Sequence, residues 1–195
     1  FFARQRDQQI TLIGGWGLSE VAPTTIRRAH AVTPVRAVQS EYSLWSREPE
    51  LGVLQTCAEL GVAFVPFSPV GRGVISSGDL TPSTFEAHDF RRVNPRFMEP
   101  NFSANMEHVR AFRAFAAAKN ISVTALALAW TMKAGDMVIP IPGTRTKEHL
   151  QDWLSAATLT LTNDDLAQVE QIMPVGWAHG ARYADNQTVG VERFC

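Results

Sequence analysis

The residues best suited to chemistry lie together in the segment MVIPIPGTRTKEHLQDWL, residues 137–154. A short apolar run ends in a Pro-Gly-Thr turn, and the cationic stretch that follows is typical of a first helical turn. The unpaired N–H groups and the positive dipole end of such a helix favour a phosphate. Arg145, Lys147 and His149 add side-chain donors at the same place. The segment therefore predicts a nucleotide-phosphate site, and a basic surface loop is the alternative.

Composition limits the class of protein. The chain has 195 residues, 45% of them hydrophobic, so it can bury a sizeable core. A net charge of −1 and a pI near 6.6 argue against general binding to nucleic acids or anionic membranes. No apolar run approaches the roughly 20 residues of a membrane span, and no signal peptide is visible.

The cysteines and histidines predict neither a disulfide framework nor a metal site. Cys57 lies in an apolar helical pattern and is expected in the core, and Cys195 is the last residue. A reducing, cytoplasmic environment is therefore expected. Because the sequence begins with Phe1 rather than Met, we expect an upstream segment to be missing. The histidines outside the cationic segment are expected at the surface or in loops: His30, His88, His108 and His179.

The elements that must position the phosphate site alternate between strands and helices, which implies a parallel sheet with helical crossovers. Residues 71–101 lack periodicity and are expected to form a functional flap. The predicted strands are residues 10–17, 35–40, 62–68 and 137–140. The predicted helices are residues 24–31, 50–60, 103–119 and 123–133, one after Gly143, and a last one through Met173.

Three helix boundaries carry specific expectations. Thr24 or Thr25 is expected to cap the first helix, and Thr162 or Asn163 the last. Gly61 is expected to end the helix at residues 50–60. The apolar face of that helix is predicted to contain Leu51, Leu54, Ala58 and Leu60.

Seven motifs resemble those of the aldo-keto reductase family, in the family's order and at roughly its spacing. They are GLSE (17–20), RRAH (27–30), VQSEYSLW (38–45), VPFSPVGRG (65–73), RRVNPRF (91–97), LALAW (126–130) and IPGTR (141–145). GARY (180–183) also resembles the tail of the bacterial and fungal branch. The resemblance implies an α/β fold of the (β/α)8 TIM-barrel lineage. The chain would supply strands five to eight, a half-barrel with a C-terminal tail, as a single domain over residues 1–195. Residues 1–15 diverge from the family.

The resemblance also implies an NADP(H) site, beginning at the nicotinamide. Ser19 and Gln39 match the family's ligands of the carboxamide, and Phe67 matches the ring that stacks on the nicotinamide. The family's usual Asn after the serine is Glu20 here. From the residues alone, Ser19 could instead cap a turn, Gln39 could satisfy a buried backbone group and Phe67 could be core.

The other end of the cofactor is matched by two loops. The family's pyrophosphate loop corresponds to Ser68, Val70, Gly71 and Arg72, with Gly71 and Gly73 expected to let the backbone approach the ligand. The 2′-phosphate segment, which favours NADP(H) over NAD(H), corresponds to Gly143, Thr144, Arg145, Lys147 and His149. Asp152 stands where the family has Glu near the adenine, and Trp153 where it has Asn.

The family's catalytic Tyr, Lys, Asp and His lie on its first four strands, so no catalytic residue is assigned in this chain. Neither Tyr42 nor Tyr183 matches the family's acid. None of the lysines matches either: Lys119, Lys133 and Lys147.

Two functions follow. By resemblance, the chain is expected to be the cofactor-binding half of an NADPH-dependent oxidoreductase that reduces aldehydes or ketones to alcohols. Alternatively, it is an inactive half-barrel that binds NADP(H) or pairs with another half. A true half-barrel exposes two sheet edges, so such a chain is expected to form a homo-oligomer or to aggregate.

Overall fold

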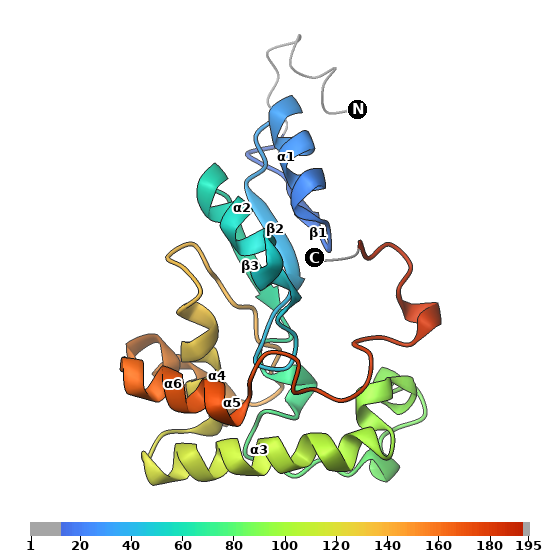
Figure 1. Cartoon of the computed structure of the whole chain (residues 1–195), viewed down its shortest axis with the longest axis vertical. Coiled ribbons are helices and arrows are strands. Elements are labelled where there is room, and N and C mark those ends of the chain that lie inside the picture. The colour runs from blue at the N-terminus through green and yellow to red at the C-terminus, as the bar shows by residue number, and fades with distance from the viewer. Residues whose placement is uncertain (1–12, 193–195) are drawn as a thin grey trace.

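A short parallel sheet organises the protein, whose computed structural model describes residues 13–192. Its strands are β1 (Gly17–Ser19), β2 (Ala37–Glu41) and β3 (Ala63–Phe67), side by side in that order (Figure 1). Residues 138–141 continue the sheet beyond β3 through two parallel bridges, Phe64 to Val138 and Phe67 to Ile141. The predicted parallel order of four successive strand segments is therefore confirmed for the described residues.

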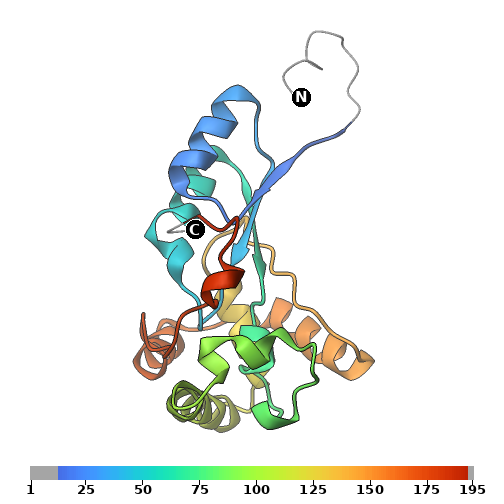
Figure 2. The same cartoon turned by 90° about the vertical axis from the view of Figure 1, so that its right-hand side faces the viewer.

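Helices connect the strands and cover one face of the sheet. They are α1 (Pro23–Val32), α2 (Val53–Leu60), α3 (Asn101–Ala118), α4 (Val123–Met132), α5 (Lys147–Leu154) and α6 (Asn163–Ile172). Figure 2 shows α1 and α2 on the same side of the strands. Among the described residues no helix is both long and apolar enough to cross a membrane.

The two faces of the sheet differ in burial. Val38 and Phe64, neighbours in register, are at most 1% exposed and pack toward the helices. Gln39 and Ser19, also neighbours in register, are exposed on the opposite face. Parallel sheets are usually covered on both faces. The exposure of Gln39 and Ser19 shows that this face of the sheet is open. The described residues form an open sheet and no closed barrel.

The hydrophobic core lies between the covered face of the sheet and the helices. Ile26 of α1, Val53 of α2 and Phe112 of α3 are fully buried there. Cys57 is 2% exposed, as the sequence predicted, and burial raises the pKa of its thiol to about 11.

Two expectations about the first elements are wrong. The predicted first strand covered residues 10–17, but the observed strand β1 begins only at Gly17. The reason is that Gly17, opposite Ala37, is the first residue of β1 in register with β2. Residues 10–12 of that prediction lie outside the described residues. Helix α1 begins at Pro23 without a side-chain cap, because the hydroxyl of Thr25 donates to Glu192 instead.

The helix predicted at residues 50–60 is divided in two. A 3₁₀ turn at Glu48–Leu51 is separated from α2 by Gly52, whose φ of 151° no helix contains. The break changes the helical phase, so Val53, Thr56 and Cys57 are buried while Leu51 is 68% exposed. The predicted apolar face is therefore wrong for Leu51 and Ala58, which are exposed, whereas Leu54 and Leu60 pack against the core as predicted. Gly61 ends α2 in the left-handed conformation, as predicted.

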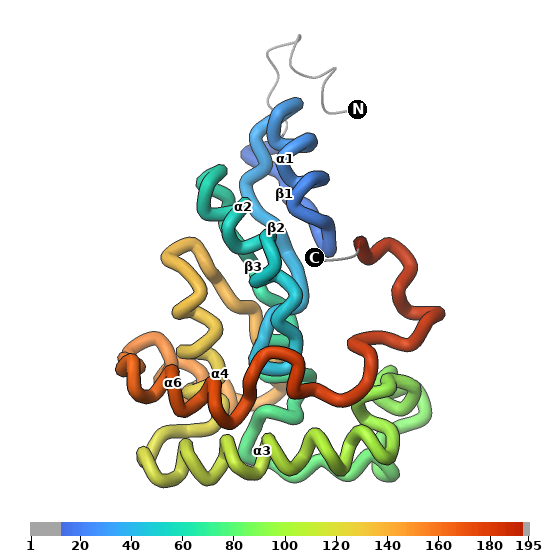
Figure 3. The backbone as a smooth tube through the Cα atoms, in the orientation of Figure 1, coloured from blue at the N-terminus to red at the C-terminus, as the bar shows by residue number. Residues whose placement is uncertain are grey.

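The later elements follow the sequence more closely. Thr162 caps α6 in a capping box with Asp165. The predicted flap contains short 3₁₀ turns at Gly71–Gly73, Pro82–Thr84, Phe90–Val93 and Pro95–Phe97. The tail after α6 crosses the molecule and returns to β1 (Figure 3), where the Glu192 N–H donates to the Glu20 carbonyl at 3.0 Å.

Candidate functional site

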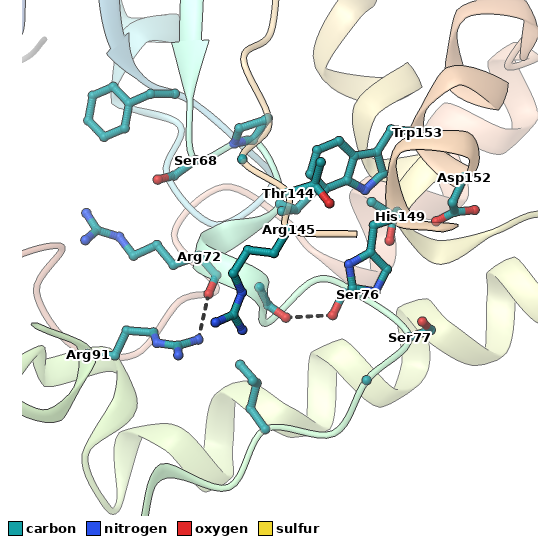
Figure 4. Close-up of a pocket in the computed structure, with 18 of the residues that line it drawn as sticks. Ser68, Arg72, Ser76, Ser77, Arg91, Thr144, Arg145, His149, Asp152 and Trp153 are labelled. Atoms are coloured by element: carbon teal, nitrogen blue, oxygen red, sulfur yellow. Dashed lines mark hydrogen bonds between the residues drawn. The ribbon is translucent and has the colours of Figure 1, made fainter. Parts of the chain in front are cut away.

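A cavity of about 770 Å³ opens at the carboxyl end of β3 (Figure 4). Its walls come from the loop after β3, the loop before α3, one residue of α4, and the segment from residue 141 into α5. This volume lies within the range of ligand sites, which is roughly 300–1,000 Å³. The carboxyl ends of parallel strands are also the usual place for ligands in α/β folds.

The loop after β3 has a conformation that functional sites often hold. Ser68 and Arg72 have positive φ angles of 51° and 58° although neither is glycine. Each such residue costs on the order of 1 kcal/mol or more, so the surrounding contacts must hold it in place. The N–H of Gly71 donates to the Ser68 carbonyl at 2.9 Å, and that of Ile75 donates to the Val70 carbonyl at 3.2 Å.

Gly71 does not have the role that the sequence suggested. It is buried with a φ of 57°, and it does not line the cavity. A Cβ atom there would lie 3.0 Å from Cγ1 of Val74, so the position faces the protein rather than a ligand. Gly71 is therefore needed for the left-handed turn, and the expected approach to a ligand applies at this loop only to Gly73, which does line the cavity.

The arginines around the cavity differ in how far their charge is compensated. Arg72 pairs with the buried carboxylate of Glu41 at 2.5 Å, and Arg91 pairs with Asp89 at 2.5 Å. The hydrogen bonds from Arg91 hold the pKa of the Asp89 carboxyl below its ordinary value. Arg145 makes no ion pair with any residue that the structure describes.

Figure 4 shows the side chains of Arg91 and Arg145 directed toward one another, whereas Arg72 points away from both. Asp89 already compensates the charge of Arg91, so of these two guanidinium groups only Arg145 still lacks a counter-charge. The uncompensated charge of Arg145 therefore marks the part of the cavity best suited to a phosphate.

The N-terminus of α5 lies beside Arg145. Thr146 caps the helix by accepting the His149 N–H at 3.2 Å, and Thr144 in turn accepts the Thr146 N–H. In the described chain the N–H groups of Lys147 and Glu148 meet no acceptor, so they are available to an anion. The helix opening predicted at this place is confirmed, and the cap is Thr146.

Trp153 forms the apolar side of the cavity. It packs against a small apolar cluster formed by Ala125 and Leu128 of α4 and Ala156, and it also lines the cavity. Asp152, one residue earlier on α5, lines the same wall. Figure 4 places Trp153 beside Thr144 and His149, so an aromatic face lies next to the polar groups. An aromatic face and a carboxylate together suit a heteroaromatic base.

The structure brings most of the predicted site residues together. Those that line the cavity are Phe67, Ser68, Val70, Arg72, Gly143, Thr144, Arg145, His149 and Asp152. Those outside its lining are Ser19, Gln39, Gly71 and Lys147. Ser19 and Gln39 are nevertheless side by side on the open face of the sheet. Gln39 lies on β2, next to the strand that carries Phe67, and Ser19 lies on β1, one strand further away.

Sequence reasoning missed several lining residues. Arg91 belongs to the quoted motif RRVNPRF, and the Asp-x-Arg spacing from Asp89 could have indicated its fixed position. Ser76 and Thr124 gave no signal, because only the tertiary fold brings the loop after β3 against α4.

Other candidate reactive groups are engaged elsewhere. Tyr42 is 3% exposed, donates to Glu50 at 2.9 Å and packs against Trp130. Burial and the Glu50 charge raise its pKa, so it is unsuited to proton transfer. His108 contacts the Ile172 carbonyl through Nδ1 at 2.6 Å. Within the described residues, no group of three or more His, Cys, Asp or Glu could hold a metal ion.

Comparison with known proteins gives a consistent result. Residues 11–174 match the model of the aldo/keto reductase family. The chain is 39% identical over 170 residues to the aldo-keto reductase yakc [NADP(+)] of Schizosaccharomyces pombe, covering 86% of this chain and 50% of that protein. It is 38% identical over 172 residues to probable aldo-keto reductase 1 of Glycine max, covering 86% of this chain and 48% of that protein.

The fold has a similar counterpart among solved structures. The glycerol dehydrogenase AKR11B4 from Gluconobacter oxydans superposes with a TM-score of 0.76 at 23% identity, covering 86% of this chain and 50% of that one. The chain thus spans about half the length of the relatives that it matches.

Proposed function

The chain belongs to the aldo/keto reductase family, and on that premise we propose that it supplies the NADP(H)-binding half of a reductase of aldehydes or ketones. The observation that carries the proposal is the uncompensated Arg145 beside the open N-terminus of α5, on the wall of a cavity of about 770 Å³. The S. pombe relative is named for NADP(+), which agrees with a site for an extra phosphate.

The residues that line the cavity suit the phosphate and adenine end of the cofactor. Arg145, Thr144 and the free N–H groups of α5 would hold the 2′-phosphate, with Asp152 and Trp153 beside the adenine. The loop at residues 68–73 would wrap the pyrophosphate through its backbone. When bound, NADPH supplies the hydride that reduces a carbonyl carbon.

The nicotinamide end rests on the strands. Phe67 ends β3 and offers a ring face, while Ser19 and Gln39 offer a hydroxyl and an amide on the open face of the sheet. These groups would orient the nicotinamide by stacking and by hydrogen bonds to its carboxamide. Their part of the site faces the side on which four further strands would stand in the family's barrel.

The acid that protonates the reduced carbonyl is proposed to lie in that other half, together with the Lys, Asp and His that the family uses. Within the described residues Tyr42 is buried and Tyr183 contacts two arginines, so neither is assigned this role. The free thiol of Cys57 accords with the proposed cytoplasmic location.

A second candidate is a self-pairing half-barrel without catalytic activity. The observation that favours it is the apolar edge beyond β3, where Met137, Ile139 and Ile141 are 48%, 56% and 44% exposed. Exposed strand edges of this kind pair with other chains. Light scattering coupled to size exclusion tests it: a dimer supports self-pairing, and a well-behaved monomer contradicts it.

An NADPH titration followed by tryptophan fluorescence tests the main proposal, because Trp153 lines the cavity. Saturable quenching is expected for the wild-type chain, and Arg145→Ala should weaken NADPH binding while leaving the far-ultraviolet dichroism unchanged. Arg110→Ala is the matched control, since Arg110 is exposed on α3 and does not line the cavity. Equal NADPH affinities for Arg145→Ala and the wild type would contradict the phosphate assignment.

A further inference from the structure

We propose that Arg182 and Tyr183 of the C-terminal tail are positioning residues for the pyrophosphate loop, which they fix through Arg72. The inference rests on the proposed function, because it names the residues that shape the cofactor loop. It starts from a closed ring of contacts among segments far apart in the sequence: Glu20, Glu41, Arg72, Arg182 and Tyr183.

Two buried carboxylates begin the ring at the ends of neighbouring strands. Glu20 follows β1 and is 7% exposed, and Glu41 ends β2 and is 1% exposed. The Glu41 N–H donates to Oε1 of Glu20 at 2.8 Å. A buried carboxylate is stable only if a cation or several hydrogen bonds compensate its charge.

Each carboxylate has its own arginine. Arg182 of the tail donates to Oε2 of Glu20 at 2.5 Å, and Arg72 of the pyrophosphate loop donates to Oε2 of Glu41 at 2.5 Å. The arginine side chains are 11% and 10% exposed, respectively. Both pairs are therefore largely shielded from water, and each arginine is held in one place.

Tyr183 closes the ring between the two arginines. The guanidinium carbons of Arg72 and Arg182 each lie 4.8 Å from the centre of its ring. Phe90 lies 4.6 Å from the Arg72 guanidinium, so aromatic rings hold Arg72 as well as its ion pair. The tail thus contacts the same guanidinium that fixes the left-handed turn at Gly71–Gly73.

The position of the tail is set independently of these contacts. Asn94 donates to the Arg182 carbonyl at 2.7 Å, and Arg96 donates to the Gly180 carbonyl at 3.2 Å. At the end of the described tail, the Glu192 carboxylate accepts the Ala22 N–H at 2.7 Å. Because the tail is anchored on both sides of Tyr183, the position of the Tyr183 ring does not depend on Arg72. The ring can therefore restrict the movement of Arg72.

The ring changes the role that the resemblance gave to Arg72. Its guanidinium is committed to Glu41, Phe90 and Tyr183, and it points away from Arg145 in Figure 4. Its carbonyl accepts from Arg91 at 3.2 Å. Arg72 therefore holds the loop in shape. The direct contacts to the pyrophosphate would then come from the loop backbone, and Arg145 would contact only the 2′-phosphate.

Hydrogen exchange of the amides at residues 70–75 tests the inference without any cofactor. Tyr183→Leu removes the ring face, and its loop amides should exchange about fivefold faster, the factor expected for losing one cation–π contact. Tyr183→Phe keeps the ring but loses the hydroxyl that is hydrogen-bonded to Arg72, so its loop amides should exchange at a rate between those of the wild type and Tyr183→Leu. Val189→Ala is the control within the tail, because Val189 is 88% exposed. Arg182→Lys keeps the charge opposite Glu20 but loses the planar group, and should resemble Tyr183→Leu. Unchanged exchange in both variants would overturn the inference.

Dinucleotide binding gives the second readout. The loop would contact the pyrophosphate common to both cofactors, so Tyr183→Leu should weaken NADPH and NADH by the same factor, whereas Arg145→Ala should weaken NADPH alone. A loss confined to NADPH in Tyr183→Leu would overturn the inference. If the wild-type chain binds neither dinucleotide, the proposed function is refuted, and the exchange rates alone then decide the role of the tail.

Discussion

Replacing Glu41 by Gln should destabilise the protein far more than an equivalent change at the surface. The carboxylate of Glu41 is 1% exposed and accepts from Arg72 at 2.5 Å and from Ser46 at 3.0 Å. Glu41→Gln keeps the size of the side chain but leaves Arg72, 10% exposed, without its counter-charge. Breaking a buried pair in this way costs roughly 3–5 kcal/mol. Because the Phe90 and Tyr183 rings still contact Arg72, we expect about 3 kcal/mol, the lower end of that range.

Urea denaturation followed by tryptophan fluorescence measures this loss. With a slope of about 2 kcal/mol per molar urea, the midpoint of Glu41→Gln should fall by about 1.5 M. Glu59→Gln is the matched control, because Glu59 pairs with Arg27 at 2.5 Å but both side chains are about half exposed, at 57% and 47%. That pair should contribute less than about 1 kcal/mol. If the two substitutions lower the midpoint equally, the buried pair does not hold the loop as described.

Further substitutions probe helix α6 and the loop after β3. Asp165 pairs with Lys119 at 2.6 Å, and its carboxylate accepts from the backbone N–H and the hydroxyl of Thr162; these contacts lower its pKa to about 2. A lowered pKa stabilises the fold above the unfolded value near 3.9, and this stability is lost as the pH falls toward 2. The difference in unfolding free energy between wild type and Asp165→Asn should therefore shrink from pH 5 to pH 2; a difference independent of pH would contradict this. Gly71→Ala should cost about 1–2 kcal/mol, because its φ is 57°. Gly143→Ala should cost less than about 0.5 kcal/mol, since a Cβ there meets nothing within 4 Å; thermal denaturation showing equal costs would refute the assigned role of Gly71.

The sequence predicted correctly those helix ends that depend only on neighbouring residues. Gly61 and Thr162 were identified correctly because a left-handed C-cap and a capping box depend on residues within one turn. The prediction for the face of α2 failed at Leu51 and missed Val53 and Cys57, because Gly52 changes the helical phase, which the apolar spacing alone does not reveal. The cap of α1 failed because Thr25 bonds to Glu192, which is 167 positions away.

The candidate site shows the same division. The order of strand, turn and helix around Arg145 was predicted correctly from the sequence, and its role as a phosphate site stays a prediction. The ring that involves Glu20 and Tyr183 could not be predicted, because it joins chain segments that only the fold brings together. Glu20 looked like an unexplained departure from the family's Asn, and the structure supplies its partner in Arg182.

The most direct test of the central claim is calorimetric binding of adenosine 2′,5′-bisphosphate and of adenosine 5′-monophosphate to the chain. These probes differ only by the 2′-phosphate, and they need neither the nicotinamide groups nor the other half of a barrel. We predict that the bisphosphate binds at least about tenfold more tightly, because the 2′-phosphate gains charge-assisted contacts with Arg145 and the N-terminus of α5. Equal affinities, or no binding of either, would contradict the assignment of this cavity to NADP(H).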